Sequence, residues 1–347
     1  MTYIKSITGG TLLAVALALL SIFISNLMAN HIIGAGVFAL LIGMLLNPVV
    51  SKYDIFENGL SFTSKKILRF AIILMGFTLS FSQVIEIGKF SLIVMVFTLF
   101  TAFAGGYLLG RLLKMDWKLS GLISAGTGIC GGSAVAAIAP VIDANDGDIA
   151  YAISATIIFD IIMVILFPLM GTYFGMTDLG YGLWAGTAIN DTSSVVAAGY
   201  AFSDVAGNFS VIVKLTRTFS IVPVVLVFSY INASVKRRSY NTVSEENQVE
   251  NPNRNNKVDI KKIFPWFILM FLGMVAIKSS GVIPQTVSDT ISSTSKFLMV
   301  MSLGAIGLKT NFSSLSKSGF TPILHGFVIS SLVVMVSFFV QVTLGQV

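Results

Sequence analysis

Nine long apolar runs constrain the fold of this chain more than any other feature. They stand at about residues 8–28, 32–50, 67–85, 90–113, 148–172, 207–230, 263–280, 297–309 and 321–345. A bilayer core about 30 Å thick needs roughly 20 apolar residues per helix, so most of these runs can span it. Charged residues make up 11% of the chain, less than half of the roughly 25% usual in soluble proteins. The sequence predicts an all-α polytopic membrane protein with about 9–11 transmembrane segments. It argues against a soluble enzyme or a nucleic-acid binder.

The distribution of Lys and Arg predicts how the chain is oriented, because basic residues accumulate in cytoplasmic loops. Placing the N-terminus in the cytoplasm puts 16 of the 22 Lys and Arg residues on the cytoplasmic side. The C-terminus is then external. The net charge of +6 follows from this topology and implies no acidic partner.

Three regions follow from the apolar runs and from one polar stretch. Residues 1–230 form an N-terminal membrane half, and residues 263–347 form the C-terminal membrane helices. Between them, 231–262 reads as a cytoplasmic linker, because 239–258 is rich in Asn, Ser and Glu.

Two apolar segments of the N-terminal half, 119–142 and 180–202, are interrupted by polar and small residues and are related to each other. Residues 125–137 align with 185–197 at an offset of 60, with seven of thirteen positions identical. If both segments cross the membrane fully, they run parallel. If each is a re-entrant hairpin, they enter from opposite faces. We expect hairpins, because inverted repeats with broken helices that meet at the midplane are a common transporter plan.

The centres of these segments predict a site for a small anion. Each tip is expected to open a short helix capped by Ser133 or Ser193, and helix N-termini bind anions. Glycines let the backbone approach the ligand, and hydroxyls add donors. The predicted substrate-binding residues are Gly126, Thr127, Gly128, Gly131, Gly132, Ser133, Thr187, Asn190, Asp191, Thr192, Ser193, Ser194 and Arg217. The alternative is that these small residues only permit close helix packing.

Charges inside spans are costly and usually functional. Asp160, Lys214 and Arg217 lie within apolar runs. One interpretation is an ion pair between Asp160 and Arg217. The other is that Arg217 or Lys214 balances substrate charge while Asp160 or Asp191 binds a coupling proton. Lys309 stands at a helix end, where it either extends to the membrane surface or contacts substrate.

The sequence contains no nucleophile–base pair, phosphate-binding loop or metal-ligand cluster, so no catalytic residue, metal or cofactor is expected. Cys130 is the one cysteine, and there are two histidines. An enzyme is therefore not predicted.

Several of these motifs resemble the signature of a family of bacterial membrane proteins labelled sulfate exporters. They are Gly126-Thr127-Gly128-Ile129-Cys130-Gly131-Gly132-Ser133, the segment Asn190–Gly199, Val213–Arg217 and Gly307–Thr310. Asn190 departs from the histidine typical of that position. The resemblance implies a multi-pass protein of the bacterial inner membrane, similar in plan to sodium/proton antiporters and bile-acid symporters. It implies sulfate, sulfite or a small sulfonate as substrate.

Together these features predict a secondary transporter of a small anion that works by alternating access, with an elevator-like mobile unit carrying both tips. The expected partners are the anion, a coupling H+ or Na+, the lipid bilayer and a second copy in a homodimer, with no nucleic acid. Two alternatives remain open. One is a proton- or sodium-coupled cation exchanger that uses Asp160 and Asp191. The other is a membrane scaffold that transports nothing.

Overall fold

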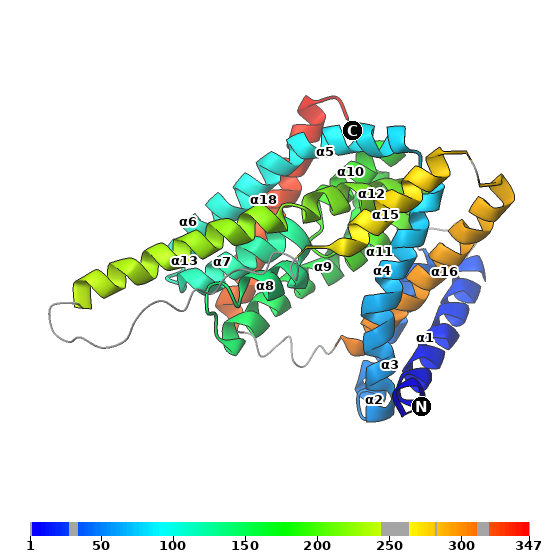
Figure 1. Ribbon diagram of the computed structural model, residues 1–347, viewed down its shortest axis with the longest axis horizontal. Helices are drawn as coiled ribbons and strands as arrows, with labels where there is room; N and C mark the ends of the chain where they lie inside the picture. The colour runs from blue at the N-terminus through cyan, green and yellow to red at the C-terminus, as the bar shows by residue number, and fades with distance from the viewer. Residues whose placement is uncertain (1, 28–33, 244–263, 282, 311–318, 347) are drawn as a thin grey trace.

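The computed structural model describes residues 2–27, 34–243, 264–281, 283–310 and 319–346, and within these ranges the regular elements are all helices (Figure 1). Six helical stretches are long and apolar enough to cross a membrane. They are Ile7–Leu27, Val84–Leu112, Asp146–Tyr173, Asp204–Val235, Thr286–Lys309 and Phe320–Thr343. Two shorter apolar helices, Ala35–Val50 and Trp266–Ser279, accompany them. The predicted all-α polytopic membrane fold is confirmed.

One group of helices, called the panel here, gathers at the right of Figure 1. It contains α1 (Thr2–Leu27), α2 (Ala35–Val50), α3 (Glu57–Phe62), α4 (Leu68–Met75), α15 (Trp266–Ser279) and α16 (Gln285–Lys309). Helix α16 packs along α2 and α4, while α15 packs on α4. A Cβ at Gly307 of α16 would clash with the carbonyl oxygen of Leu40 in α2. The backbones of α2 and α16 therefore touch, as small residues allow in membrane helix pairs.

The remaining helices form a second group, called the core bundle. It contains α5 (Phe81–Phe100), α6 (Gly106–Leu112), α7 (Trp117–Ala125), α8 (Gly132–Ile138), α9 (Asp146–Tyr173), α10 (Asp178–Ala188), α11 (Thr192–Phe202), α12 (Asp204–Thr218), α13 (Ile221–Val243) and α18 (Phe320–Thr343). Helix α12 packs on α10 and α11, and α18 packs on α9, α10 and α5. The core bundle meets the panel mainly where α11 contacts α2 and α16.

The first broken segment folds back on itself. Helix α7 continues as the π-helical turn η5 (Gly126–Cys130), and the chain reverses before α8. The ammonium of Lys118, at the start of α7, donates to the carbonyl oxygen of Asp143, beyond the end of α8, over 2.8 Å. A Cβ on Gly126 would lie 3.3 Å from the side chain of Val135 in α8. The two ends of this segment therefore lie side by side, as the hairpin interpretation predicts.

The second broken segment is a hairpin as well. The hydroxyl of Ser203, after α11, donates to the carboxylate of Asp178, at the start of α10, over 2.5 Å. The rings of Tyr181 and Phe202 stack with their centroids 4.0 Å apart. The two hairpins are joined by α9, whose 28 residues extend about 42 Å at 1.5 Å per residue. Because α9 begins near the base of one hairpin and ends near the base of the other, the two enter from opposite ends.

The predicted boundary at residue 230 falls inside a helix. Helix α13 continues to Val243, well into the stretch read as a linker. No Gly or Pro stands between 231 and 243 to interrupt it, while Lys and Arg are good helix formers. The rest of the predicted linker, 244–262, lies outside the described residues.

Candidate functional site at the junction of two hairpins

The tips of the two hairpins meet beside the middle of α9. Gly131 turns the first tip with a φ of 62°, a conformation that glycine adopts at little cost. A Cβ built on Gly131 would lie 3.2 Å from the Cβ of Asp191 in the second tip and 3.3 Å from its Oδ1. We call this meeting point the junction. Asp160, which contacts the second tip, is the fifteenth of the 28 residues of α9 and so lies about halfway along it.

Asp160 binds the second tip through the backbone. Its Oδ1 accepts a hydrogen bond from the N–H of Asn190 over 2.9 Å, and its Oδ2 accepts one from the N–H of Asp191 over 2.8 Å. Only 2% of the Asp160 surface is exposed. These N–H groups lie just before α11, where the helix dipole presents partial positive charge. A built-in carboxylate therefore occupies the N-terminal end of α11.

The caps of the short helices differ from those predicted. Asp191 is the N-cap of α11, because its Oδ2 accepts bonds from both the backbone N–H and the hydroxyl of Ser193. Helix α8 begins at Gly132 after Gly131, without a side-chain cap bond. The prediction that Ser133 and Ser193 are N-caps is wrong. A carboxylate accepts N–H bonds more strongly than a hydroxyl, which explains why Asp191 caps the helix in place of Ser193.

Two fully buried cations bind the ends of the first arms of both hairpins. The ammonium of Lys214 donates to the carbonyl oxygens of Ile129 and Ile189, each over 2.9 Å. Both carbonyls belong to the final residues of a hairpin's first arm, where the helix dipole places partial negative charge. Lys214 therefore links the two tips.

The guanidinium of Arg217 spans the same two arms. Its Nε donates to the carbonyl oxygen of Gly128 over 2.5 Å, its Nη1 to that of Thr187 over 2.6 Å, and its Nη2 to that of Thr127. In the structure Arg217 binds carbonyls and Asp160 binds N–H groups. The ion pair that we considered between them is therefore not among the salt bridges of the described residues.

Helix α18 contributes residues that the sequence interpretation missed. The hydroxyl of Ser330 lies 3.3 Å from that of Thr127 and accepts from the amide of Asn190 over 3.1 Å, so it contacts both tips. The hydroxyl of Ser337 lies 2.6 Å from that of Thr187. Both serines are fully buried. Polar residues recurring at 330, 337 and 341 in an apolar run were the available signal, since spacings of seven and four residues keep one side of a helix polar.

The predicted site residues divide by accessibility. Ser133 is exposed, while Gly132, Asp191, Thr192 and Ser194 are half-buried. These five residues form what we call the rim of the junction. The others lie beneath it and are buried: Gly126, Thr127, Gly128, Gly131, Thr187, Asn190, Ser193, Lys214, Arg217 and Asp160. Lys309 lies apart from them, at the end of α16 in the panel, where its ammonium donates to the hydroxyl of Ser61.

Comparison with known proteins gives the family of the chain. The family model "Conserved hypothetical protein 698" matches residues 9–326. A UPF0324 membrane protein of Clostridium tetani is 74% identical over 347 residues, covering 100% of both chains. A UPF0324 membrane protein of Streptococcus pneumoniae is 37% identical and covers 99% of both chains, and one of Streptococcus agalactiae is 38% identical over 90% of this chain and 91% of its own. No solved structure matches the chain. The chain is therefore a multi-pass membrane protein that belongs to the UPF0324 family, whose family model carries the description conserved hypothetical protein 698.

Proposed function

We propose that this protein is a secondary transporter that moves a small oxyanion together with a proton, and that the junction is where both bind. The observation that carries this proposal is the balance of charge at the junction. The two carboxylates of Asp160 and Asp191 stand against the two cations Lys214 and Arg217, and all but Asp191 are buried there. A cargo that brings no net charge keeps this balance at membrane depth, where unpaired charge is costly.

A bare metal cation fits the junction less well. Transporters that bind Na+ coordinate it with unwound backbone carbonyls and with the C-terminal ends of half-helices. At this junction, Lys214 and Arg217 already bind the carbonyls of Ile129, Ile189, Gly128, Thr187 and Thr127. The positions that would hold Na+ are thus filled by the protein's own cations.

The rim offers hydroxyl donors for an oxyanion and a carboxylate that can bind a proton. Ser133, Thr192 and Ser194 carry hydroxyl donors, and these residues are exposed or half-buried. Asp191 is the ionisable group among the rim residues. Protonation of Asp191 removes the repulsion between its carboxylate and the cargo and leaves the junction with one net positive charge. A singly charged anion, such as a sulfonate or hydrogen sulfite, then restores neutrality, whereas the dianions sulfate and sulfite need a second proton. Sulfate, sulfite and small sulfonates are the first cargoes to test.

The two-group architecture supports an elevator-like movement, with the core bundle moving past the panel. The contact between them is largely apolar: Val37 and Leu303 of the panel belong to the same hydrophobic cluster as Val196 and Val211 of the core bundle. Apolar surfaces resist sliding less than interlocked polar ones, since few hydrogen bonds must break. With the orientation that the basic residues favour, the first hairpin enters from the cytoplasm and the second from outside.

Cation exchange is the second candidate, and one atom favours it. The Oδ1 of Asn190 is buried beside the junction without a hydrogen-bond partner among the described residues. A buried oxygen that accepts no hydrogen bond can bind a ligand's donor or a cation. In a sodium/proton exchanger, the Oδ1 of Asn190 would coordinate sodium beside the carboxylate of Asp191.

Ligand-dependent thermal unfolding of the purified protein tests the proposal. A ligand that binds the folded state raises its stability by RT ln(1 + [L]/Kd). We expect saturable stabilisation by one sulfur oxyanion, stronger at acidic pH, and its loss in Ser133→Ala/Ser194→Ala, which removes two of the rim hydroxyls. The control is Ser64→Ala/Ser280→Ala, two serines of the panel. Stabilisation by sodium alone would support the second candidate and contradict the first.

A further inference from the structure

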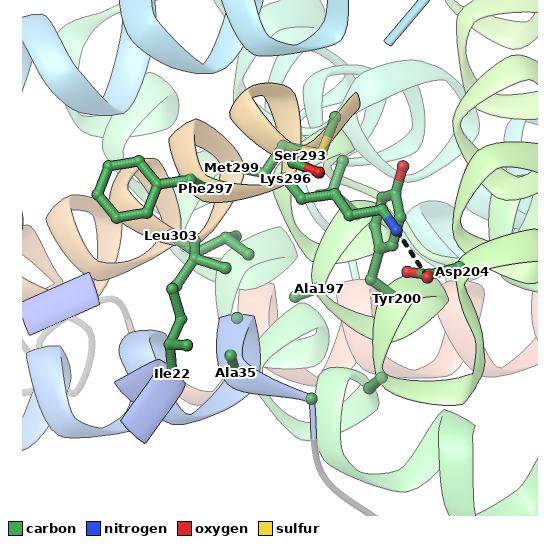
Figure 2. A pocket seen from close by; sticks show the side chains of 15 residues that line it. Ile22, Ala35, Ala197, Tyr200, Asp204, Ser293, Lys296, Phe297, Met299 and Leu303 are labelled. Atoms are coloured by element: carbon green, nitrogen blue, oxygen red, sulfur yellow. Dashed lines mark hydrogen bonds and ion pairs between the residues drawn. The ribbon is translucent and has the colours of Figure 1, made fainter. Parts of the chain in front are cut away.

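A pocket lies where the core bundle meets the panel, outside the junction. It has a volume of about 330 Å³ and is bordered by α11 on one side and by α1, α2 and α16 on the other (Figure 2). Its walls are mainly apolar, formed by Val196 and Ala197 of α11 and by Phe297, Met299 and Leu303 of α16. We call it the interface pocket. Its volume stands at the lower end of the roughly 300–1,000 Å³ typical of small-molecule sites.

Two charged side chains stand among the residues that line the interface pocket. The ammonium of Lys296, from α16 of the panel, donates to Oδ2 of Asp204, the first residue of α12 in the core bundle, over 2.6 Å (Figure 2). Their side chains are 39% and 66% exposed. An ion pair this exposed is weak and is readily opened by a competing anion. It also joins the two groups of helices that the proposed movement separates.

The interface pocket opens onto the same face of α11 as Ser193 at the junction. Val196, Ala197 and Tyr200 line it and stand three, four and seven residues after Ser193. Residues at these spacings share one side of a helix. Tyr200 is about 10 Å from Ser193 at 1.5 Å per residue. A solute in the pocket therefore lies within about two helical turns of Ser193, along the same side of α11.

We propose that the interface pocket is the outer chamber of the cargo path and that it binds a small organic anion with an apolar body. Lys296 holds the charged head of this anion, and Asp204 holds Lys296 when the chamber is empty. This inference rests on the proposed function and adds a substrate class to it. The apolar walls select the body of the anion, which sulfate and sulfite lack. Short alkanesulfonates are the matching chemistry.

An apolar chamber predicts how binding affinity changes with the length of the ligand's alkyl chain. Each methylene that the walls remove from water strengthens binding by about fourfold, the equivalent of the usual transfer free energy of a methylene. Affinity should therefore rise from methanesulfonate to 1-butanesulfonate. The neutral 1-butanol has the same body and no charge, so it should bind much more weakly.

Titration calorimetry of the full chain in nanodiscs, with these compounds and with sulfate, tests the proposal. Lys296→Gln should weaken 1-butanesulfonate binding about tenfold or more, the effect of losing one hydrogen bond to a charged group. Lys296→Arg should retain most of the affinity, since it keeps the positive charge. Asp204→Asn should strengthen binding, because it frees Lys296. Ala197→Leu should abolish binding by filling the chamber, whereas Ala150→Leu, at an exposed position of α9, should not.

Three results would overturn the outer chamber. They are equal affinity for 1-butanesulfonate in the parent protein and Lys296→Gln, equal affinity for 1-butanol and 1-butanesulfonate, and no dependence on chain length. The second would mark an apolar pocket for lipid or detergent. Failure here is separable from failure of the proposed function. Sulfite binding that depends on Ser133 and Ser194 would survive the loss of the chamber, and 1-butanesulfonate binding that depends on Lys296 would survive the loss of the junction site.

Discussion

The carboxylate of Asp160 in α9 accepts a hydrogen bond from the backbone N–H of Asn190 in the second hairpin over 2.9 Å. Through this bond, the long apolar helix α9 holds the tip of the second hairpin about halfway along its length. The positively charged side chains of Lys214 and Arg217 bind the same hairpin by donating hydrogen bonds to backbone carbonyls at the end of its first arm. The junction is thus built from fixed charges that match the ends of broken helices.

Replacing Asp160 by Asn should destabilise the protein. The amide of Asn has one acceptor oxygen where the carboxylate has two, so one of the two backbone N–H groups loses its partner. The variant also leaves the junction with an uncompensated positive charge. Breaking a buried charged interaction costs about 3 kcal/mol. We expect a lower midpoint in thermal unfolding, with Asp146→Asn, an exposed residue of the same helix, as the control. Equal midpoints would contradict the role given to Asp160.

Arg217→Lys should destabilise the contact between the two hairpins even though it keeps the charge. A lysine ammonium cannot reproduce the planar fork with which Arg217 contacts three carbonyls on two arms. Each buried carbonyl left without a donor costs about 1–3 kcal/mol. Thermal unfolding should therefore show a clear loss of stability, while Arg111→Lys on the exposed side of α6 should show almost none. A stable Arg217→Lys would mean that charge alone matters here.

Neighbouring glycines of the first tip should respond differently to the same change. Gly131→Ala places a methyl group against Asp191 and forces alanine to φ 62° and ψ −136°, a sparsely populated conformation that costs about 1–3 kcal/mol. Gly132→Ala meets its nearest neighbour, Ile153, only at 3.8 Å. We expect Gly131→Ala to lose ligand-dependent stabilisation and Gly132→Ala to keep it. Similar behaviour of the two variants would show that Gly131 and Asp191 need not touch.

Thiol labelling checks the hairpins directly. In a Cys130→Ala background, single cysteines replace the exposed residues Arg111, Asp146, Tyr173 and Val205. Because Arg111 and Asp146 flank the first hairpin, an impermeant maleimide should label both from one side of the membrane. Tyr173 and Val205 flank the second hairpin and should both be labelled from the other side. If Arg111 and Asp146 were labelled from opposite sides, the first segment would cross the membrane fully.

Much of this architecture can be predicted from the sequence, because the internal repeat and the apolar runs are visible as residue patterns. The 60-residue offset between the tips predicts two related hairpins, and the apolar runs predict the spans. The partners of Lys214 and Arg217 could not be predicted, since they are backbone carbonyls, which every residue carries. Asp191 and Ser193 compete for the cap of α11, and their spacing does not decide between them. The helical stretch from 231 to 243 was missed because its polar composition resembles a loop.

Proton movement in proteoliposomes shows whether the protein carries an anion together with a proton. Vesicles containing the protein and a pH-sensitive dye are given an inward gradient of sulfite, sulfate or methanesulfonate, with sodium held equal on both sides. If the protein carries an anion together with a proton, one of these anions drives proton entry and internal acidification, and Asp191→Asn abolishes it while leaving the protein folded. Anion uptake without any proton movement, or proton movement that depends on sodium and ignores all three anions, would contradict the proposal.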